Sequence, residues 1–234
     1  MHTLNATVTS VRRATPSTRI VRVRPSRTPF VYRAGQAAEI GPADANTLTP
    51  YSIASAPEDT ARDGLVEFLI KVDSHDRWGD NYDPLRRGQS LRLNGAFGRF
   101  TFPDNVTRGR FLLIAGGTGI APLRSMIRHG RALGEKIEFR LLYSARTPAD
   151  FAYRSELVGM ARRGEIELTL TATRDVPPRW RGERGRITKA LLAPLTNEQP
   201  QLCFVCGPAS MVEDVPRILV ELGLERSRIR IEEW

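Results

Sequence analysis

A glycine-rich segment, Gly116-Gly117-Thr118-Gly119, is the first place where residue types and spacing point to chemistry. It directly follows the apolar run Phe111–Ala115, and Pro122 stands where the first turn of a helix would begin. Glycines let a backbone approach a pyrophosphate closely, and a helix N-terminus supplies unpaired N–H donors and the positive end of a dipole. The segment therefore predicts a phosphate site for a dinucleotide. The alternative is a turn that only closes a βα unit, and a P-loop is excluded because no Gly-Lys-Ser or Gly-Lys-Thr follows.

Two further segments carry candidate chemical groups. In Pro50-Tyr51-Ser52-Ile53-Ala54-Ser55, the tyrosine offers an aromatic face to a flat ring, and the Ser52 hydroxyl can donate or accept a hydrogen bond. Read alone, this segment is also an ordinary strand with alternating polar positions. Cys206, in Cys206-Gly207-Pro208, is a small polarisable residue at the end of a predicted central strand, where ligands of open α/β sheets gather. Its alternative is a buried core cysteine.

The elements that must position these groups change character near the middle of the chain. Up to about residue 104, short alternating strands such as Val66-x-Phe68-x-Ile70-x-Val72 are separated by Gly, Pro and Asp, which predicts a small antiparallel barrel. From Arg110 onward, apolar runs alternate with helical stretches, the pattern of a doubly wound parallel sheet with helices on both faces. We therefore expect an antiparallel β-barrel domain over 1–104, a polar turn-rich boundary over 103–109, and a nucleotide-binding α/β domain over 109–234.

Composition limits the function classes. Lys and Arg exceed Asp and Glu to give a net charge of +9, and 32 of the 35 basic residues are arginine. No basic tract with interleaved aromatics occurs, so nucleic acid is not expected as a partner, whereas an acidic protein is. The two cysteines, Cys203 and Cys206, should point to opposite faces of one strand, so neither a disulfide nor a metal site is expected, and two cysteines are too few for an iron–sulfur cluster. No membrane span or signal peptide is visible, and a cytoplasmic location is expected.

With these motifs in hand, the chain resembles the ferredoxin–NADP(+) reductase superfamily over nearly its whole length. The resemblance rests on five motifs in order: Phe30-x-Tyr32-x-x-Gly35-Gln36; Pro50 to Ser55; Gly116 to Pro122; Tyr143-Ser144-Ala145-Arg146-Thr147 leading to Asp150, Tyr153 and Glu156-Leu157; and Cys206-Gly207-Pro208-x-x-Met211. It implies a flavin on the barrel, FAD before FMN, and NADPH or NADH as hydride donor. No role is assigned to His2, His75 or His129.

The resemblance also implies site residues. Tyr51 is expected along the flavin ring, Ser52 near its N5 and Cys206 near nicotinamide C4, all lining one cleft, while Trp234 would cover the flavin face and move before hydride passes. The expected catalytic residues are Ser52, Cys206 and Trp234. The expected cofactor-binding residues are Thr49, Pro50, Tyr51, Ser52, Ile70, Val72, Gly79, Asp80, Asn81, Gly117, Thr118, Gly119, Pro122, Ser144, Arg146, Arg174, Cys206, Gly207, Pro208, Met211 and Trp234.

Two positions depart from the family pattern. Thr49 stands where the family usually has an arginine for the flavin phosphate, so a charge-assisted contact is lost. Gly79 stands where a serine or threonine is common, with Asp80 beside it. A short helix opened by Gly79-Asp80-Asn81-Tyr82 could still hold phosphate, although an aspartate repels it. Arg77, Arg86 and Arg99 are candidate replacements for the missing charge.

The predicted activity is hydride transfer from NAD(P)H to flavin, followed by electron transfer to a ferredoxin, flavodoxin or oxygenase component. NADPH is preferred over NADH, because Arg146 and Arg174 follow two successive strands and paired guanidinium groups suit a 2′-phosphate. Two alternatives stay open. The weakened phosphate motifs favour a flavin reductase that releases reduced flavin, and loss of tight flavin binding would also suit a non-catalytic electron-transfer subunit.

Overall fold

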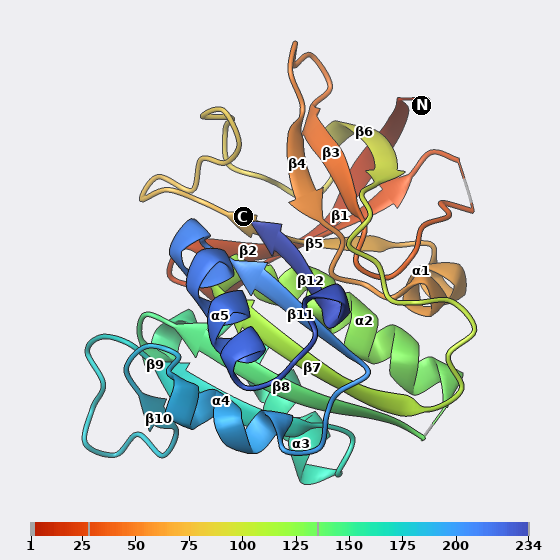
Figure 1. The fold of residues 1–234 in the computed structure, drawn as a ribbon. Coiled ribbons are helices and arrows are strands. Elements are labelled where there is room, and N and C mark those ends of the chain that lie inside the picture. The colour runs from red at the N-terminus through yellow and green to blue at the C-terminus, as the bar shows by residue number, and fades with distance from the viewer. Residues whose placement is uncertain (1–2, 28, 135, 234) are drawn as a thin grey trace. The chain divides into compact units, whose positions relative to one another are not determined.

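The computed structural model of the protein describes residues 3–27, 29–134 and 136–233. The chain forms two compact units (Figure 1). The first contains the described residues up to Phe102 together with Arg124–Ala132, and the second contains Pro103–Leu123 and the residues from Leu133 onward. A stretch of one helix is therefore part of the unit formed by the N-terminal strands. Among the helices of the described residues, none combines the length and apolarity needed to cross a bilayer.

The first unit is built on an antiparallel six-stranded sheet, as predicted. Its strand order is β4-β3-β6-β1-β2-β5. A bridge between Ile53 and Phe68 joins the segment after β4 to β5, and the Ala54 amide donates to the Glu67 carbonyl at 2.7 Å, which links the two edges of the sheet. The strands are β1 Leu4–Thr15, β2 Thr18–Pro25, β3 Ala37–Pro42, β4 Thr49–Ser52, β5 Val66–Lys71 and β6 Ser90–Phe97.

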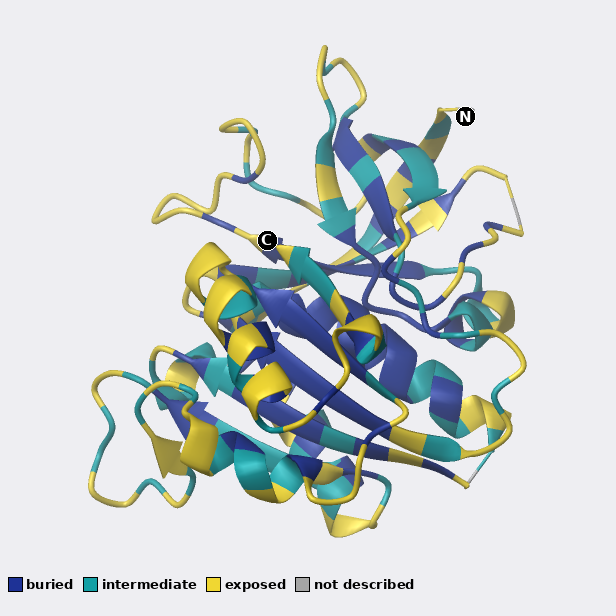
Figure 2. Ribbon diagram, in the orientation of Figure 1, coloured by how far each residue is buried: buried dark blue, intermediate teal, exposed yellow. Residues whose placement is uncertain are grey.

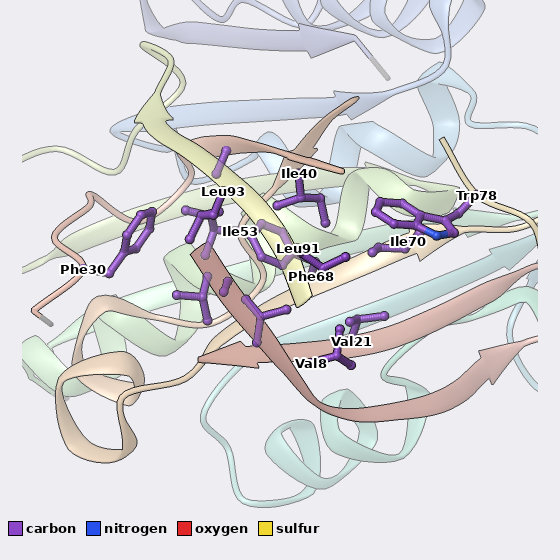
Figure 3. Close-up of a cluster of buried hydrophobic side chains, with 14 of the residues drawn as sticks. Val8, Val21, Phe30, Ile40, Ile53, Phe68, Ile70, Trp78, Leu91 and Leu93 are labelled. Atoms are coloured by element: carbon purple, nitrogen blue, oxygen red, sulfur yellow. The ribbon is translucent and has the colours of Figure 1, made fainter. Parts of the chain in front are cut away.

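Apolar side chains from these strands fill the interior of the first unit (Figure 3). Alternation along β1 and β2 turns Val8, Val21 and Val23 inward, as the period of two requires. In β5 the alternation gives way to burial of every residue from Val66 to Ile70. This strand is covered on both faces, because Glu67 forms an ion pair with the buried Arg124. Helix α1, Pro57–Asp63, follows the Pro50–Ser55 segment.

The second unit is a parallel six-stranded sheet in the order β10-β9-β8-β7-β11-β12, which confirms the predicted fold class. Its central strands are buried along most of their length (Figure 2). Each strand of this sheet is paired in parallel with its neighbours, so the carboxyl ends of all strands lie at one edge. The strands are β7 Gly109–Gly116, β8 Ile137–Ala145, β9 Glu167–Ala172, β10 Glu183–Arg184, β11 Leu202–Gly207 and β12 Ile229–Glu233.

Helices α4 and α5 pack on one face of this sheet (Figure 1). Leu192, Val215 and Leu219 lie against Leu112 and Cys203 there, while the alternate strand residues are buried on the opposite face. The α-helices are α2 Ile120–Leu133, α3 Arg154–Arg162, α4 Lys189–Thr196 and α5 Ala209–Glu221, and the short 3₁₀ helices are η1 Gly117–Gly119, η2 Pro148–Asp150 and η3 Arg226–Arg228.

Candidate functional site

The predicted phosphate turn joins β7 to α2. Gly117–Gly119 form the single 3₁₀ turn η1, and α2 begins at Ile120, so that Pro122 lies in the first helical turn as expected. Gly117 has a φ of 55°, which favours glycine, and it is exposed with open space where a side chain would stand. Exposed main chain at the N-terminal end of a fourteen-residue helix suits an anionic group.

The Cys206–Met211 motif lies directly against this turn, within the second unit. A Cβ on Gly119 would lie 2.2 Å from the Cys206 carbonyl oxygen, and a Cβ on Gly116 would lie 2.8 Å from Pro208 Cδ and 2.9 Å from Met211 Sδ. The two motifs, almost ninety residues apart in the chain, therefore pack directly against each other. Only glycine allows this approach, because any side chain would occupy the space of the other segment.

The carboxyl ends of three strands, β7, β8 and β11, lie next to this contact between the two motifs. Ala115 of β7 is paired with Cys206 of β11 on one side and with Tyr143 of β8 on the other, and Gly116 is paired with Ser144. Ligands of open α/β sheets bind at this edge, where the strands end and the helices start. The fit to a dinucleotide phosphate is thus supported by exposed glycine main chain, a helix N-terminus and the ends of central strands.

Tyr143 supports the turn in a way that the sequence patterns did not indicate. Its buried hydroxyl donates to the Gly117 carbonyl at 2.9 Å and accepts from the Ala152 amide at 3.2 Å. Burial raises the pKa of this phenol far above its ordinary value, so the hydroxyl stays protonated and able to donate. In the sequence, Tyr143 begins the Tyr143-Ser144-Ala145-Arg146-Thr147 motif, but nothing in that motif indicates a contact with Gly117.

Cys206 is fully buried and carries a neutral thiol. Burial raises the pKa of Cys206 well above its ordinary value, and the nearby Glu232 carboxylate raises it further. Cys203 and Val205 belong to the apolar cluster under α4 and α5, and Cys206 does not, in agreement with the prediction that the two cysteines face opposite sides of the strand. A neutral, small side chain can leave room beside a ligand, but it is no nucleophile in this state.

Arg146 and Arg174 lie next to each other at the same sheet edge. The Arg174 amide donates to the Arg146 carbonyl at 2.6 Å, and both side chains are exposed. Trp180 holds the loop that follows Arg174, since its ring stacks on Phe151 at a centroid distance of 5.5 Å and lies 5.3 Å from the Arg154 guanidinium carbon. These two exposed arginines on adjacent backbone segments carry the charge that binding of a phosphate dianion requires.

In the first unit, Tyr51 and Ser52 lie in β4, which is four residues long. The Tyr51 hydroxyl accepts a hydrogen bond from the Gly79 amide at 3.1 Å, and its ring lies 6.1 Å from that of Trp78. Partial burial raises the pKa of Tyr51 to about 12, so the phenol is neutral at physiological pH. Ser52 is buried at 6% exposure. Tyr51 thus presents a fixed, neutral aromatic ring on a short strand.

The expected helix at Gly79–Tyr82 is wrong: this segment is a tight turn. Trp78 and Tyr82 form an antiparallel bridge with two main-chain hydrogen bonds, and the intervening residues make the turn, with Asn81 at a φ of 64°. The hairpin is favoured over a helix because Trp78 and Tyr82 pack edge to face at 5.0 Å over the barrel core. No helix N-terminus is therefore available for phosphate at these residues.

The surroundings of this hairpin do not suit a phosphate. The Asp80 carboxylate accepts a hydrogen bond from the Thr47 hydroxyl at 3.1 Å, and the Thr49 hydroxyl oxygen is buried without a hydrogen-bond partner among the described residues. Arg77, one candidate for the missing positive charge, is paired with Asp73 at 2.9 Å. The flat ring of a flavin fits the aromatic features of this region better than a phosphate fits its charges.

Three other expected residues have different outcomes. Ile70 is fully buried and Val72 is 6% exposed, and both belong to the barrel core, so their side chains pack inside the first unit. Trp234 lies outside the described residues. Arg86 and Arg99, the other candidate cations, are exposed.

Comparison with known proteins agrees with this geometry. A family model for the oxidoreductase NAD-binding domain matches residues 113–217. The ferredoxin–NADP reductase B of Sorangium cellulosum is 32% identical over 192 residues, which cover 79% of this chain and 77% of that protein. A cytochrome P450 reductase from Amycolatopsis superposes with a TM-score of 0.86 at 24% identity, over 99% of this chain and 69% of its own. The ferredoxin reductase in carbazole 1,9a-dioxygenase has a TM-score of 0.83 at 26% identity, with the same two coverages.

The chain belongs to the ferredoxin–NADP(+) reductase superfamily. It is an oxidoreductase, and its residues 113–217 match the oxidoreductase NAD-binding domain.

Proposed function

We propose that the protein is a flavin-dependent NAD(P)H oxidoreductase that takes hydride from NADPH or NADH and passes electrons to a ferredoxin, a flavodoxin or an oxygenase component. The observation that carries the proposal is the close packing of Gly116–Gly119 against Cys206–Met211 at the carboxyl ends of the central strands, beside the exposed main chain of Gly117. A second observation is the fixed aromatic ring of Tyr51 in the first unit. Relatives named for ferredoxin and for cytochrome P450 support a protein as electron acceptor.

In this proposal a bound flavin, FAD before FMN, supplies the hydride acceptor and the means to release electrons one at a time. The protein binds and orients. The exposed main chain of Gly117 and the α2 N-terminus would hold the pyrophosphate of the dinucleotide, and Tyr143 keeps the Gly117 carbonyl turned toward its own hydroxyl. Tyr51 packs on the flavin ring, Ser52 hydrogen-bonds its edge, and the neutral Cys206 leaves room for the nicotinamide. No acid–base pair is required.

A positively charged surface supports an acidic partner. Basic residues exceed acidic ones by seven in the first unit and by two in the second. Such an excess raises the rate of encounter with an acidic electron carrier, and this rate falls as salt is added. We therefore propose an acidic carrier protein as the electron acceptor. The proposed location of the reaction is the cytoplasm.

NADPH is the proposed donor, with NADH second, on the basis of Arg146 and Arg174. Arg174→Gln should raise the KM for NADPH about tenfold and leave the KM for NADH unchanged, because one guanidinium–phosphate contact is removed. Arg179→Gln, an exposed arginine in the same loop, is the matched control. The assignment would be refuted if Arg174→Gln raised the KM for NADPH and the KM for NADH by the same factor, or if Arg179→Gln changed both KM values as much as Arg174→Gln does.

The Trp78–Tyr82 hairpin favours a second function, reduction of a free flavin that is then released. Asp80 brings negative charge to this hairpin, and no ion pair to it occurs among the described residues. Asp80→Asn should tighten FMN and FAD about two- to fivefold and leave riboflavin, which has no phosphate, unchanged. Asp83→Asn, an exposed carboxylate in the same loop, is the control. The same affinity gain for riboflavin would contradict a phosphate effect.

One experiment tests the proposal as a whole: an absorption spectrum of the fresh protein, followed by anaerobic addition of NADPH. A yellow protein that is bleached by NADPH supports the electron-transfer reductase. A colourless protein that consumes NADPH only with added flavin supports the flavin reductase. A colourless protein that is inert with both added would overturn the enzyme proposal and leave the subunit interpretation.

A further inference from the structure

Ser55, the last residue of the Pro50–Ser55 segment, is a buried junction in the first unit. Its carbonyl accepts hydrogen bonds from the Ser125 hydroxyl at 2.6 Å and the Tyr32 hydroxyl at 3.0 Å. Its own hydroxyl accepts from the Glu67 amide at 3.0 Å. Ser125 is fully buried and comes from α2, seventy residues further along the chain. A carbonyl held by two hydroxyl donors has little freedom to turn.

The neighbouring Ala54 is held by the same helix. The Arg124 guanidinium donates to the Ala54 carbonyl at 2.6 Å and lies 3.1 Å from a Glu67 carboxylate oxygen. Arg124 is 7% exposed and Glu67 is 8% exposed. Burying an arginine lowers stability unless the charge is both paired with an opposite charge and hydrogen-bonded, and the contacts with Glu67 and Ala54 meet these two conditions. The position is therefore specific for a long side chain with several donors.

One turn further along α2, Arg128 continues this row of contacts. Its guanidinium donates to both oxygens of Asp59, at 2.6 and 2.7 Å. Asp59 in turn accepts from the Ala56 amide at 3.1 Å. Residues four apart lie on one face of a helix, so Arg124 and Arg128 reach the same side. Three consecutive residues after Ile53 are thus held directly by α2 or by a side chain that α2 holds.

Strand β4 needs such support because it is short and lies at the end of the strand order. It is paired along its length with β3, and beyond Ser52 the Ile53–Phe68 bridge gives one further point of attachment. We infer that Arg124 and Ser125 are positioning residues for the Tyr51–Ser52 segment, and that they act through the carbonyls of Ala54 and Ser55. The inference rests on the proposed function, since it assigns α2 a role in setting the flavin-ring site.

The test uses the full chain with Ser125→Ala, which removes one hydroxyl donor and little volume. Hydrogen–deuterium exchange is measured on the flavin-free protein over residues 50–56, and FMN affinity is measured by quenching of flavin fluorescence. We expect amide exchange in this segment to rise about fivefold or more, and the FMN Kd to rise about five- to tenfold, because one buried carbonyl loses a donor. The unfolding midpoint in urea controls for a general loss of stability.

Two further variants separate positioning from stability. Thr9→Val removes a hydroxyl-to-carbonyl hydrogen bond of 3.0 Å elsewhere in the first unit, to the Arg22 carbonyl, and should leave both readouts at wild-type values. Arg124→Lys keeps the positive charge beside Glu67 on a shorter side chain with fewer hydrogen-bond donors. It should therefore give a smaller loss of FMN affinity than Arg124→Met, which removes the charge.

The outcomes are distinct. Wild-type exchange and FMN affinity in Ser125→Ala would overturn the inference, and so would faster exchange without a change in FMN affinity. If the wild-type protein binds no flavin at all, the proposed function fails on its own. The exchange data then still decide whether α2 holds the segment.

Discussion

Replacing Gly119 by alanine tests the main-chain contact between the two motifs of the second unit. The new Cβ would lie 2.2 Å from the Cys206 carbonyl oxygen, 2.5 Å from its carbonyl carbon and 2.9 Å from the Gly207 nitrogen. Ordinary van der Waals contact at a Cβ begins at 3.4 Å. All three atoms belong to the main chain of β11 and its exit, so no side chain can rotate away. The turn must therefore move by about 1 Å relative to β11.

Two magnitudes follow from this displacement. Forcing an extra carbon into a well-packed site lowers the free energy of unfolding by about 1–3 kcal/mol. A shift of about 1 Å in a binding segment can lower kcat/KM by about a hundredfold. We expect Gly119→Ala to raise the KM for NADPH by about ten- to a hundredfold, with a smaller change in kcat once the site is saturated, because the turn is proposed to hold the pyrophosphate.

The assay is steady-state NADPH oxidation with ferricyanide as acceptor and added flavin, together with urea unfolding. Gly164→Ala is the matched control, since Gly164 has a φ of 73° and open space where a Cβ would stand. It should lose about 1–2 kcal/mol from the positive φ alone and keep the wild-type KM. A Gly119→Ala protein with unchanged stability and unchanged KM would refute the reasoning.

Three further predictions concern buried polar groups. The ion pair with Arg128 lowers the pKa of Asp59 to about 2 against the burial that opposes it, so Asp59→Asn should cost about 2 kcal/mol of stability at pH 7. Because the folded-state pKa is the lower one, this difference should be complete above about pH 5 and disappear as the pH falls toward 2; a pH-independent loss in urea titrations would contradict it. Tyr143→Phe should lower the free energy of unfolding by about 1–3 kcal/mol and raise the KM for NADPH several-fold. A variant with wild-type stability and wild-type KM would contradict a role for Tyr143 in supporting the glycine turn. Burial raises the pKa of both thiols, so Cys203 and Cys206 should not react with a thiol reagent at pH 8 until the protein is unfolded, when two thiols appear; rapid labelling of the native protein would contradict their burial.

The hairpin at Trp78–Tyr82 bears on which flavin the protein uses. A carboxylate at Asp80 and an arginine, Arg77, that is already paired with Asp73 leave this hairpin with no surplus of positive charge. The Tyr51 ring nevertheless keeps a fixed position through the Gly79 amide. A protein of this kind would recognise the flavin more by its ring than by its phosphate, which is why the affinity for riboflavin is as informative as that for FAD.

Much of the architecture was readable from local patterns. Alternating strands in the first half and apolar runs separated by helical stretches in the second half predicted the antiparallel and parallel sheets, because backbone geometry imposes periods of 2 and 3.6 residues. The glycine turn before α2 was predictable because glycines, a preceding apolar run and Pro122 all lie within a few residues of one another.

Other features depended on partners that are distant in the sequence. Glycine and aspartate at 79–80 permit a helix start or a turn, and the packing of Trp78 against Tyr82 over the barrel core decided for the turn. The role of Tyr143 depends on Gly117, which lies twenty-six residues earlier.

By itself, then, the sequence determined the two kinds of sheet and the glycine turn, since each of these depends on neighbours within one turn or strand. Only the tertiary structure decided that Gly119 lies against the Cys206 carbonyl and that Arg124 and Ser125 hold Ala54 and Ser55. These contacts join residues about seventy or more positions apart, and a close approach of that kind depends on how complete elements pack, which no local pattern encodes.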